Sequence, residues 1–200
     1  MRIFLIFGLF FAVFLGACSQ QDSVPEATGP WHLLPGQSHV GFISVKKGTM
    51  IEAHSFGTLS GAVSVDGVTS VTVALDSVET NIDIRNERMR TYLFETKKYP
   101  LAKISTKIDM AQFAAMKIGE RVTMSQNVTV NMHGETAGFD VALIVTRLGV
   151  NKISVDNQEP VVLDIEDFSM QTGVEKLREL ASLPSITPEV PVSFSLVFER

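Results

Sequence analysis

Four histidines and a few scattered carboxylates are the side chains of this sequence that could carry out acid–base or metal chemistry. The histidines are His32, His39, His54 and His133, and no pair has a metal-ligand spacing such as H-E-x-x-H. The carboxylates that could pair across strands are Asp76, Glu79, Asp164 and Glu166, although solvent-facing strand edges explain them equally well. The sequence contains no Gly-x-Ser-x-Gly elbow and no phosphate-binding loop. We therefore expect no metal site, no catalytic residue and no enzymatic activity, while a Ser-His-Asp site assembled in space stays open.

Cys18 is the only cysteine of the chain and lies at the end of a short apolar run. Arg2 precedes thirteen residues, 3–15, without a charged or polar side chain, and Gly16 and Ala17 lead into Cys18. This order is typical of a secretory signal, and the run is short for a membrane-spanning helix. The stretch also resembles the lipobox of bacterial lipoproteins, in which the cysteine is acylated. We expect residues 1–18 to be a signal sequence and Cys18 to be the site of lipid attachment.

The following residues, 19–30, are predicted to form a flexible tether to a single domain over 31–200. They are polar and contain two prolines and a glycine. Without Arg2, the chain has 16 basic and 22 acidic side chains, a balance of −6. Because phosphate backbones require concentrated positive charge, we expect no binding of nucleic acid.

Alternation of apolar and polar residues predicts that most of this domain is β-structure. The segment 190–199 places Val190, Val192, Phe194, Leu196 and Phe198 on one face, and 139–145 and 71–75 alternate in the same way. Less strict patterns occupy 38–46, 52–65, 101–108, 121–133 and 161–165. Many antiparallel strands with short connections indicate a sandwich or a closed barrel.

Two segments are predicted to be helical. The first, 173–184, carries an apolar stripe and ends at Pro184. The second, 81–94, has Asn81 or Thr80 as its expected N-cap. It is expected to turn Met89, Leu93 and Phe94 inward and Arg85, Glu87, Arg88 and Arg90 toward water. A short helix of this kind suits either the cover of a barrel end or simple completion of the core.

The order of motifs resembles the YceI-like family of secreted, lipocalin-like β-barrels that bind polyisoprenoid lipids. The residues that carry the resemblance are "SHVGF" (38–42), "FGTLSGAV" (56–63), the block 73–106, "VTVNMHGETAGFDV" (128–141), "DFSM" (167–170) and the closing segment 190–199. The block 73–106 is the most specific part. The segment 173–184 is an insertion relative to the family at large.

The resemblance implies an all-β fold, an antiparallel lipocalin-like barrel of about eight strands with one or two short helices. It also implies one bound isoprenoid-type lipid, a polyprenyl chain or a quinone, and no other cofactor. An apolar chain requires aliphatic and aromatic walls. As hypothesised lining of the cavity we name Phe42, Phe56, Phe94, Tyr99, Phe139 and Phe168, although ordinary core packing also explains each of them.

Two functions stay open at this point. The first is a membrane-tethered, non-enzymatic protein that transports, stores or sequesters an isoprenoid-type lipid in the cell envelope, facing the periplasm. Ser19 after the cysteine favours the outer membrane over the inner, because lipoproteins kept in the inner membrane often carry Asp there. The second is an envelope interaction module whose barrel is filled by its own side chains. A homodimer is compatible with either, and no interface signature marks one.

Overall fold

Antiparallel strands make up most of residues 28–200, the part of the chain that our computed structural model describes. The predictions for the signal sequence, for Cys18 and for most of the tether fall outside these residues. The strands are β1 Trp31–Leu33, β2 His39–Lys46, β3 Met50–Phe56, β4 Leu59–Val63, β5 Val68–Ala74, β6 Val78–Glu79, β7 Leu101–Lys107, β8 Arg121–Met132, β9 Glu135–Gly149, β10 Lys152–Asn157, β11 Val161–Asp164 and β12 Glu189–Glu199. The helices are α1 Asp83–Arg88, α2 Ala111–Ala114 and α3 Gln171–Leu180. A π-helical turn, η3 Met89–Leu93, continues α1, and 3₁₀ turns are η1 Pro35–Gln37, η2 Leu75–Ser77 and η4 Ile165–Phe168.

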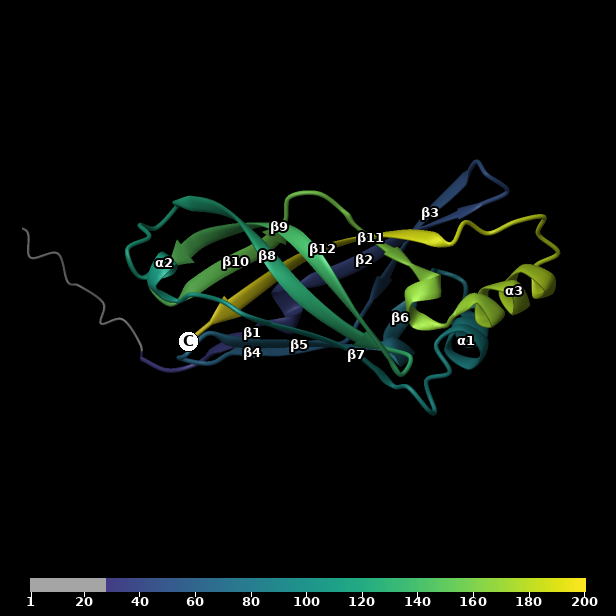
Figure 1. The fold of residues 1–200 in the computed structure, drawn as a ribbon, viewed down its shortest axis with the longest axis horizontal. Helices are drawn as coiled ribbons and strands as arrows, with labels where there is room; N and C mark the ends of the chain where they lie inside the picture. The colour runs from purple at the N-terminus through teal and green to yellow at the C-terminus, as the bar shows by residue number, and fades with distance from the viewer. Residues whose placement is uncertain (1–27) are drawn as a thin grey trace, which may run out of the picture.

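The strands close into a ring of eight in the order β1-β4-β5-β7-β8-β9-β10-β12, because β12 also pairs with β1. Each neighbouring pair is antiparallel. The remaining strands lengthen the same wall, since β2 and β11 pair with the first half of β12, β3 pairs with β2, and β6 pairs with β3. The structure thus confirms the predicted antiparallel barrel (Figure 1).

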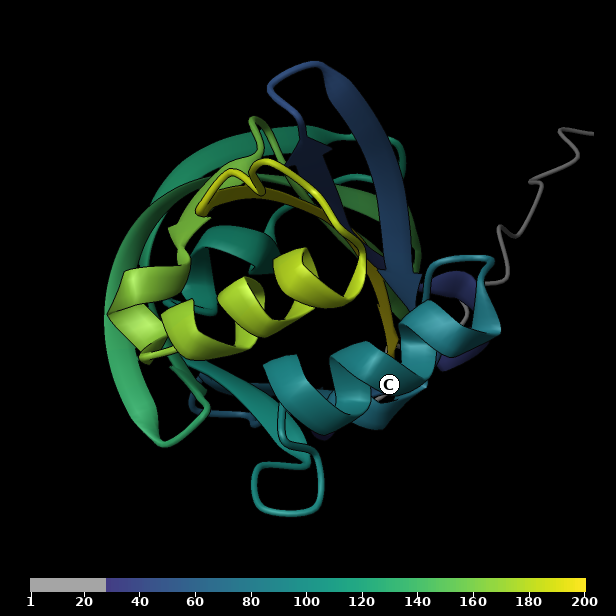
Figure 2. The same ribbon diagram turned by 90° about the vertical axis from the view of Figure 1, so that its right-hand side faces the viewer.

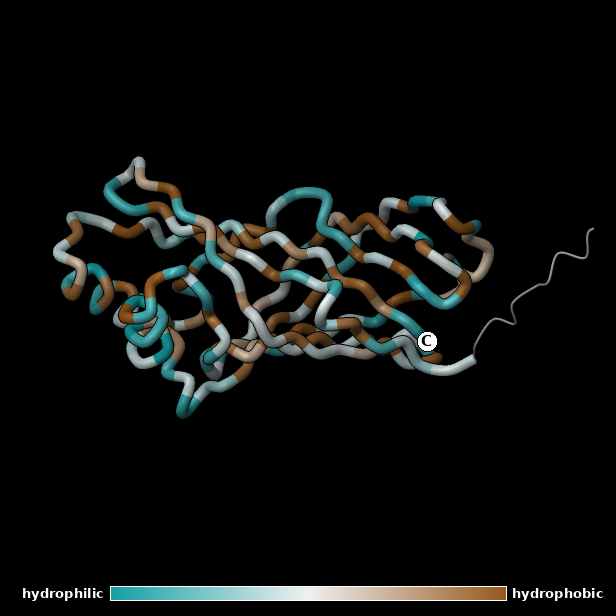
Figure 3. Tube along the Cα trace, turned by 180° about the vertical axis from the view of Figure 1, so that it is seen from behind, coloured by the Kyte–Doolittle hydropathy of each residue, from teal (hydrophilic) through white to brown (hydrophobic). Residues whose placement is uncertain are grey.

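Period-two alternation places the core inside this ring. In β9, Val141, Leu143 and Val145 are buried, while the residues between them are only partly covered. The trace in Figure 3 shows hydrophobic and hydrophilic positions alternating along the strands. The apolar side chains point inward because a strand turns successive side chains to opposite faces.

Helices cover one end of the barrel, which we call the α1/α3 end. There α3 packs across η3 (Figures 1 and 2). The contact is close at Gly173, where an added Cβ would lie 2.5 Å from the carbonyl oxygen of Tyr92. The short helix α2 lies at the opposite end, which we call the α2 end.

Both predicted helices are present, with differences in detail. The segment 81–94 forms α1 and η3, and Met89, Leu93 and Phe94 are buried as expected. The predicted cap is wrong, because Ile82 occupies the N-cap position without a side-chain hydrogen bond. Asn81 instead has a positive φ of 59°, which a left-handed turn requires and which asparagine tolerates.

Candidate functional site

An apolar cavity occupies the inside of the barrel. The volume of the cavity is about 230 Å³. This is many times the roughly 10–15 Å³ that one water molecule needs. All eight ring strands contribute to its wall. Apart from the indole of Trp31, the polar side chains in that wall are those of Thr69 and Thr106. The cavity can therefore hold an aliphatic chain, which gains free energy as its apolar surface leaves water.

Two of the six predicted contact residues, Phe56 and Phe139, line this cavity. Phe42 and Phe94 are not in its wall but pack on Phe56, with ring centroids 5.4 Å and 5.8 Å from it. Phe168 is fully buried and stacks on Phe139 at 6.4 Å, also outside the wall. These three rings hold the two wall aromatics in place from behind, and direct contact of any of the six with a ligand stays a prediction.

Tyr99 lies away from the cavity wall. Its ring packs on His133, with centroids 4.5 Å apart, at the tight turn between β8 and β9. The Nδ1 of His133 lies 3.0 Å from the carbonyl oxygen of Phe168, and its Nε2 lies 3.1 Å from a carboxylate oxygen of Glu95. Tyr99 and His133 thus fasten the β8–β9 turn to the segments beside it.

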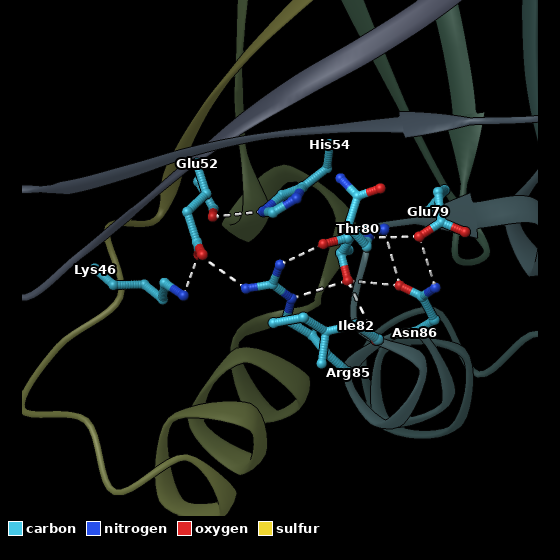
Figure 4. Close-up of polar contacts among 10 residues, drawn as sticks. Lys46, Glu52, His54, Glu79, Thr80, Ile82, Arg85 and Asn86 are labelled. Atoms are coloured by element: carbon cyan, nitrogen blue, oxygen red, sulfur yellow. Dashed lines mark hydrogen bonds and ion pairs between the residues drawn. The ribbon is translucent and has the colours of Figure 1, made fainter.

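A cluster of charged side chains lies between the β2–β3 hairpin and α1 at the α1/α3 end (Figure 4). The carboxylate of Glu52 accepts hydrogen bonds from Lys46 and from Arg85, the latter at 2.9 Å. All three side chains are at most 30% exposed. Two cations share one carboxylate, so the charged cluster carries a net charge of +1. The expectation that Arg85 points to water is therefore wrong.

His54 lies on the same face of the hairpin, between the charged cluster and the cavity. Its side chain is 7% exposed, its Nε2 lies 2.9 Å from the hydroxyl of Ser44, and its ring lies 5.1 Å from that of Phe42. The other ring nitrogen, Nδ1, is buried and has no hydrogen-bond partner among residues 28–200. A buried polar atom without a partner costs roughly 1–3 kcal/mol, which makes this nitrogen a candidate for contact with a ligand.

Hydrogen bonds to Thr80 fasten α1 to the wall beside the charged cluster. Arg85 donates from Nε to the Thr80 hydroxyl at 2.9 Å and from an Nη to the Thr80 carbonyl at 2.7 Å. The buried amide of Asn86 accepts from the backbone N–H and hydroxyl of Thr80 and donates to Glu79. Glu79 is thus a structural anchor of the helix rather than a member of a carboxylate pair.

The protonation states of the polar end follow from these contacts. The hydrogen bond from Lys46 lowers the pKa of Glu52, with Arg85 adding to the effect and burial opposing it. Burial lowers the pKa of His54, and the positive charge of Arg85 lowers it further. At neutral pH the charged cluster therefore contains one ionised carboxylate and two cations, and the imidazole of His54 beside it is uncharged.

Two further observations concern other kinds of site. Within residues 28–200, no three His, Cys, Asp or Glu side chains are placed together so that they could hold a metal ion. In the same residues, no helix combines the length and the apolar character needed to cross a membrane.

The sequence of residues 31–198 matches the YceI-like domain family. The chain belongs to the YceI-like family. Its resemblance to that family, drawn above from the order of motifs, is therefore confirmed. A comparison with curated proteins finds no match.

Several solved structures resemble this barrel to different degrees. A polyisoprenoid binding domain from Saccharophagus degradans implicated in plant cell wall breakdown is 40% identical, with a TM-score of 0.83 over 84% of this chain and 97% of that one. BcnA from Burkholderia cenocepacia is 18% identical, with a TM-score of 0.64 over 82% and 98%. The YceI protein of Campylobacter jejuni is 16% identical, with a TM-score of 0.53 over 74% and 84%. The last two support the fold alone.

Sequence reasoning missed the polar end of this YceI-like barrel. It assigned no role to Lys46, Glu52 or His54, and it placed Arg85 in solvent. The alternation of β2 could have indicated them, because it places Ser44 and Lys46 on the same inward face as Val40 and Phe42. The pairing of β2 with β3 then adds Glu52 and His54 to that face, and this pairing depends on the register of the hairpin.

Proposed function

We propose that the protein binds an isoprenoid-type lipid in the barrel cavity and acts on it by transport, storage or sequestration rather than by catalysis. The observation that carries this proposal is the continuous apolar wall, which suits a branched hydrocarbon chain and offers few polar groups. The 40% identical relative is named as a polyisoprenoid binding domain, which supports the same class of ligand. The alternative of a barrel filled by its own side chains predicts no cavity, and this barrel has one.

We also propose where in the cell the protein acts. Acylation of Cys18 holds it at a membrane of the bacterial cell envelope, facing the periplasm, with the outer membrane favoured. Several acyl chains on one residue provide firm attachment, since each buried CH₂ contributes about 0.8 kcal/mol. The anchored barrel then receives or releases a lipid that belongs to the same membrane.

The test uses Trp31, the one tryptophan of the sequence, which lines the cavity. Titration with a prenylated benzoquinone is expected to quench its fluorescence to saturation. Ala102 also lines the cavity and is small, so Ala102→Phe places a ring in the space that the chain needs. We expect this variant to weaken binding by about tenfold or more, because the lost contacts are apolar area.

The matched control is Ser105→Ala on the same strand, whose side chain is not in the cavity wall. It is expected to bind like the unmodified protein. Both variants are first compared by thermal unfolding, so that loss of the fold is not mistaken for loss of the cavity. Unchanged quenching in a folded Ala102→Phe protein would place the ligand outside the barrel and contradict the proposal.

A further inference from the structure

The inward face of the β2–β3 hairpin changes from apolar to polar as it leaves the cavity. Cross-strand pairs on this face run Val40 with Phe56, then Phe42 with His54, then Ser44 with Glu52. Val40 and Phe56 line the cavity, and the other four residues continue the same face beyond it. The aromatic pair Phe42 and Phe56 therefore joins the hydrocarbon-like wall to the charged cluster.

The α2 end of the cavity offers one buried nitrogen without a hydrogen-bond partner among residues 28–200, the indole Nε1 of Trp31, which can only donate. The guanidinium groups of Arg147 and Arg200 pack against its ring. Thr69 and Thr106 lie toward that end, and both hydroxyls are already used within the protein. The hydroxyl of Thr69 donates to the carbonyl of Gly67 at 3.3 Å. That of Thr106 donates to the carbonyl of Asn127 at 2.7 Å and accepts from the side chain of Gln126. The two ends of the cavity thus differ in the hydrogen bonds that they offer. The indole at the α2 end can only donate, whereas the imidazole under the α1/α3 cover can donate or accept and lies beside the charged cluster.

We infer that the bound lipid is amphipathic and lies in one direction, with a neutral, oxygen-bearing head group against His54 and its isoprenoid chain running toward the α2 end. This inference rests on the proposed function. A quinone carbonyl accepts a hydrogen bond and a prenol hydroxyl can donate or accept one, and either gives the unpaired Nδ1 a partner. The tautomer of His54 decides whether that nitrogen donates or accepts.

The charges favour a neutral head group over a diphosphate. Lys46 and Arg85 both hydrogen-bond to Glu52, and Arg85 makes two further bonds to Thr80. The cluster has a net charge of only +1 to set against a diphosphate, which would need several free cationic donors. The uncharged imidazole supplies a single hydrogen bond, which matches one oxygen.

Entry of the head group requires a local change. Nδ1 of His54 is out of contact with solvent, and the Phe42 ring lies against the imidazole at 5.1 Å. A head group that reaches Nδ1 therefore moves a neighbouring side chain, and the partly exposed Phe42 is the ring in contact with the imidazole.

The test is photo-crosslinking of the full chain in phosphatidylcholine vesicles. The probe is an azidobenzoquinone that carries a chain of four isoprene units, and the cross-linked peptides are mapped by mass spectrometry. Cross-links that fall within 42–54 or 85–94, and that disappear when the unlabelled quinone competes, support the orientation. Cross-links at Trp31, Thr69 or Thr106 would show the reverse orientation and overturn the inference. Absence of any competed cross-link would overturn the proposed function itself.

Competitors of the same chain length identify the head group. The prenylated benzoquinone and the prenol are expected to compete well. The prenyl diphosphate is expected to compete no better than the hydrocarbon, which has no head group. Strong competition by the diphosphate would overturn the inference that the head group is neutral. The orientation of the lipid would still be decided by the cross-linked peptides.

His54→Phe tests the hydrogen bond directly. We expect it to weaken binding of quinone and prenol about three- to tenfold, the range that one net hydrogen bond represents. Binding of the hydrocarbon should stay unchanged. The control Ser105→Ala, whose side chain is outside the cavity wall, should not change the binding of any of the three ligands. If His54→Phe does not fold, Ser44→Ala takes its place, because it removes the partner of Nε2 and should give a smaller loss in the same direction. An equal loss for all three ligands would mean that His54 only shapes the barrel.

Discussion

His54 is the residue at which apolar wall and charged cluster meet, and its environment makes the folded protein sensitive to acid. Burial lowers the pKa of His54, so the folded protein resists a proton that the unfolded chain accepts below about 6.5. The stabilising effect of the neutral imidazole is therefore complete above that pH. It is lost progressively as the pH falls from about 6.5 toward the lower folded-state pKa.

We expect the free energy of unfolding of the unmodified protein to fall between about pH 7.5 and 5.5 relative to that of His54→Phe. Denaturant unfolding of both proteins at several pH values measures this difference. The other histidines are shared by the two proteins, so the comparison isolates His54. Parallel curves would contradict the account of a buried, neutral imidazole.

Glu52 is the second residue whose removal has a clear expected cost. Glu52→Gln keeps the shape of the side chain but leaves Lys46 and Arg85 without the carboxylate that they share. We expect a loss of about 1–2 kcal/mol in the free energy of unfolding, since hydrogen bonds to charged groups are stronger than neutral ones.

Glu159→Gln is the matched control for this measurement, because Glu159 is exposed and its side chain lies outside the charged cluster. It should change stability by no more than about 0.5 kcal/mol. Since the pKa of Glu52 is lowered, its contribution is complete above about 4.5 and is lost as the pH falls through the folded-state value. The two variants should therefore converge in strong acid, and a constant difference would count against the ion pairs.

At the scale of elements, the packing of α3 on η3 depends on the absence of a side chain at Gly173. A Cβ there would lie 2.5 Å from the carbonyl oxygen of Tyr92 and 2.9 Å from the Cα of Leu93, and both are backbone atoms that cannot turn aside. Alanine favours a helix over glycine by up to about 1 kcal/mol. Overpacking costs about 1–3 kcal/mol. We expect Gly173→Ala to destabilise the protein on balance, as measured by thermal unfolding.

Gly138→Ala provides the control within β9, since a Cβ at that position meets nothing within 4 Å. It should leave the unfolding temperature unchanged or raise it slightly, because glycine is unfavourable in a strand. If Gly173→Ala proves as stable as this control, α3 is held more loosely over the barrel end than its contacts indicate.

The elements also show what alternation can and cannot predict. Long segments with one buried face, such as β9 and β12, were predicted within a few residues because their period is unambiguous. The three-residue β1 was not predicted. The strand β10, 152–157, was missed although Ile153 and Val155 alternate with polar residues, because two apolar positions are too few to establish a period. The four-residue α2 is too short to show a helical period. Closure of the ring through β1 thus came from the family resemblance and not from periodicity.

At the scale of the whole molecule, the barrel combines an apolar interior with one polar end. The interior could be predicted, because the alternating residues that make the strands also supply the cavity wall. The polar face of the β2–β3 hairpin could have been found from its alternation, but its contact with Arg85 of α1 could not, because Arg85 lies 33 positions beyond Glu52. This contact depends on the position of α1 relative to the barrel, and the local sequence pattern does not predict that position.

The most direct measurement of the central claim is identification of what the barrel carries when it is made in a cell. The chain from residue 19 onward, which lacks the acylated cysteine, would be produced in a bacterial periplasm, purified without detergent and extracted with organic solvent for mass spectrometry. An unrelated barrel prepared identically, and the Ala102→Phe variant, provide the controls. We predict a stoichiometric quinone or polyprenyl lipid in the unmodified protein and little or none in both controls. If the protein repeatedly contains no lipid and does not bind added isoprenoids, the account is contradicted. Membership of the family would then support the fold alone.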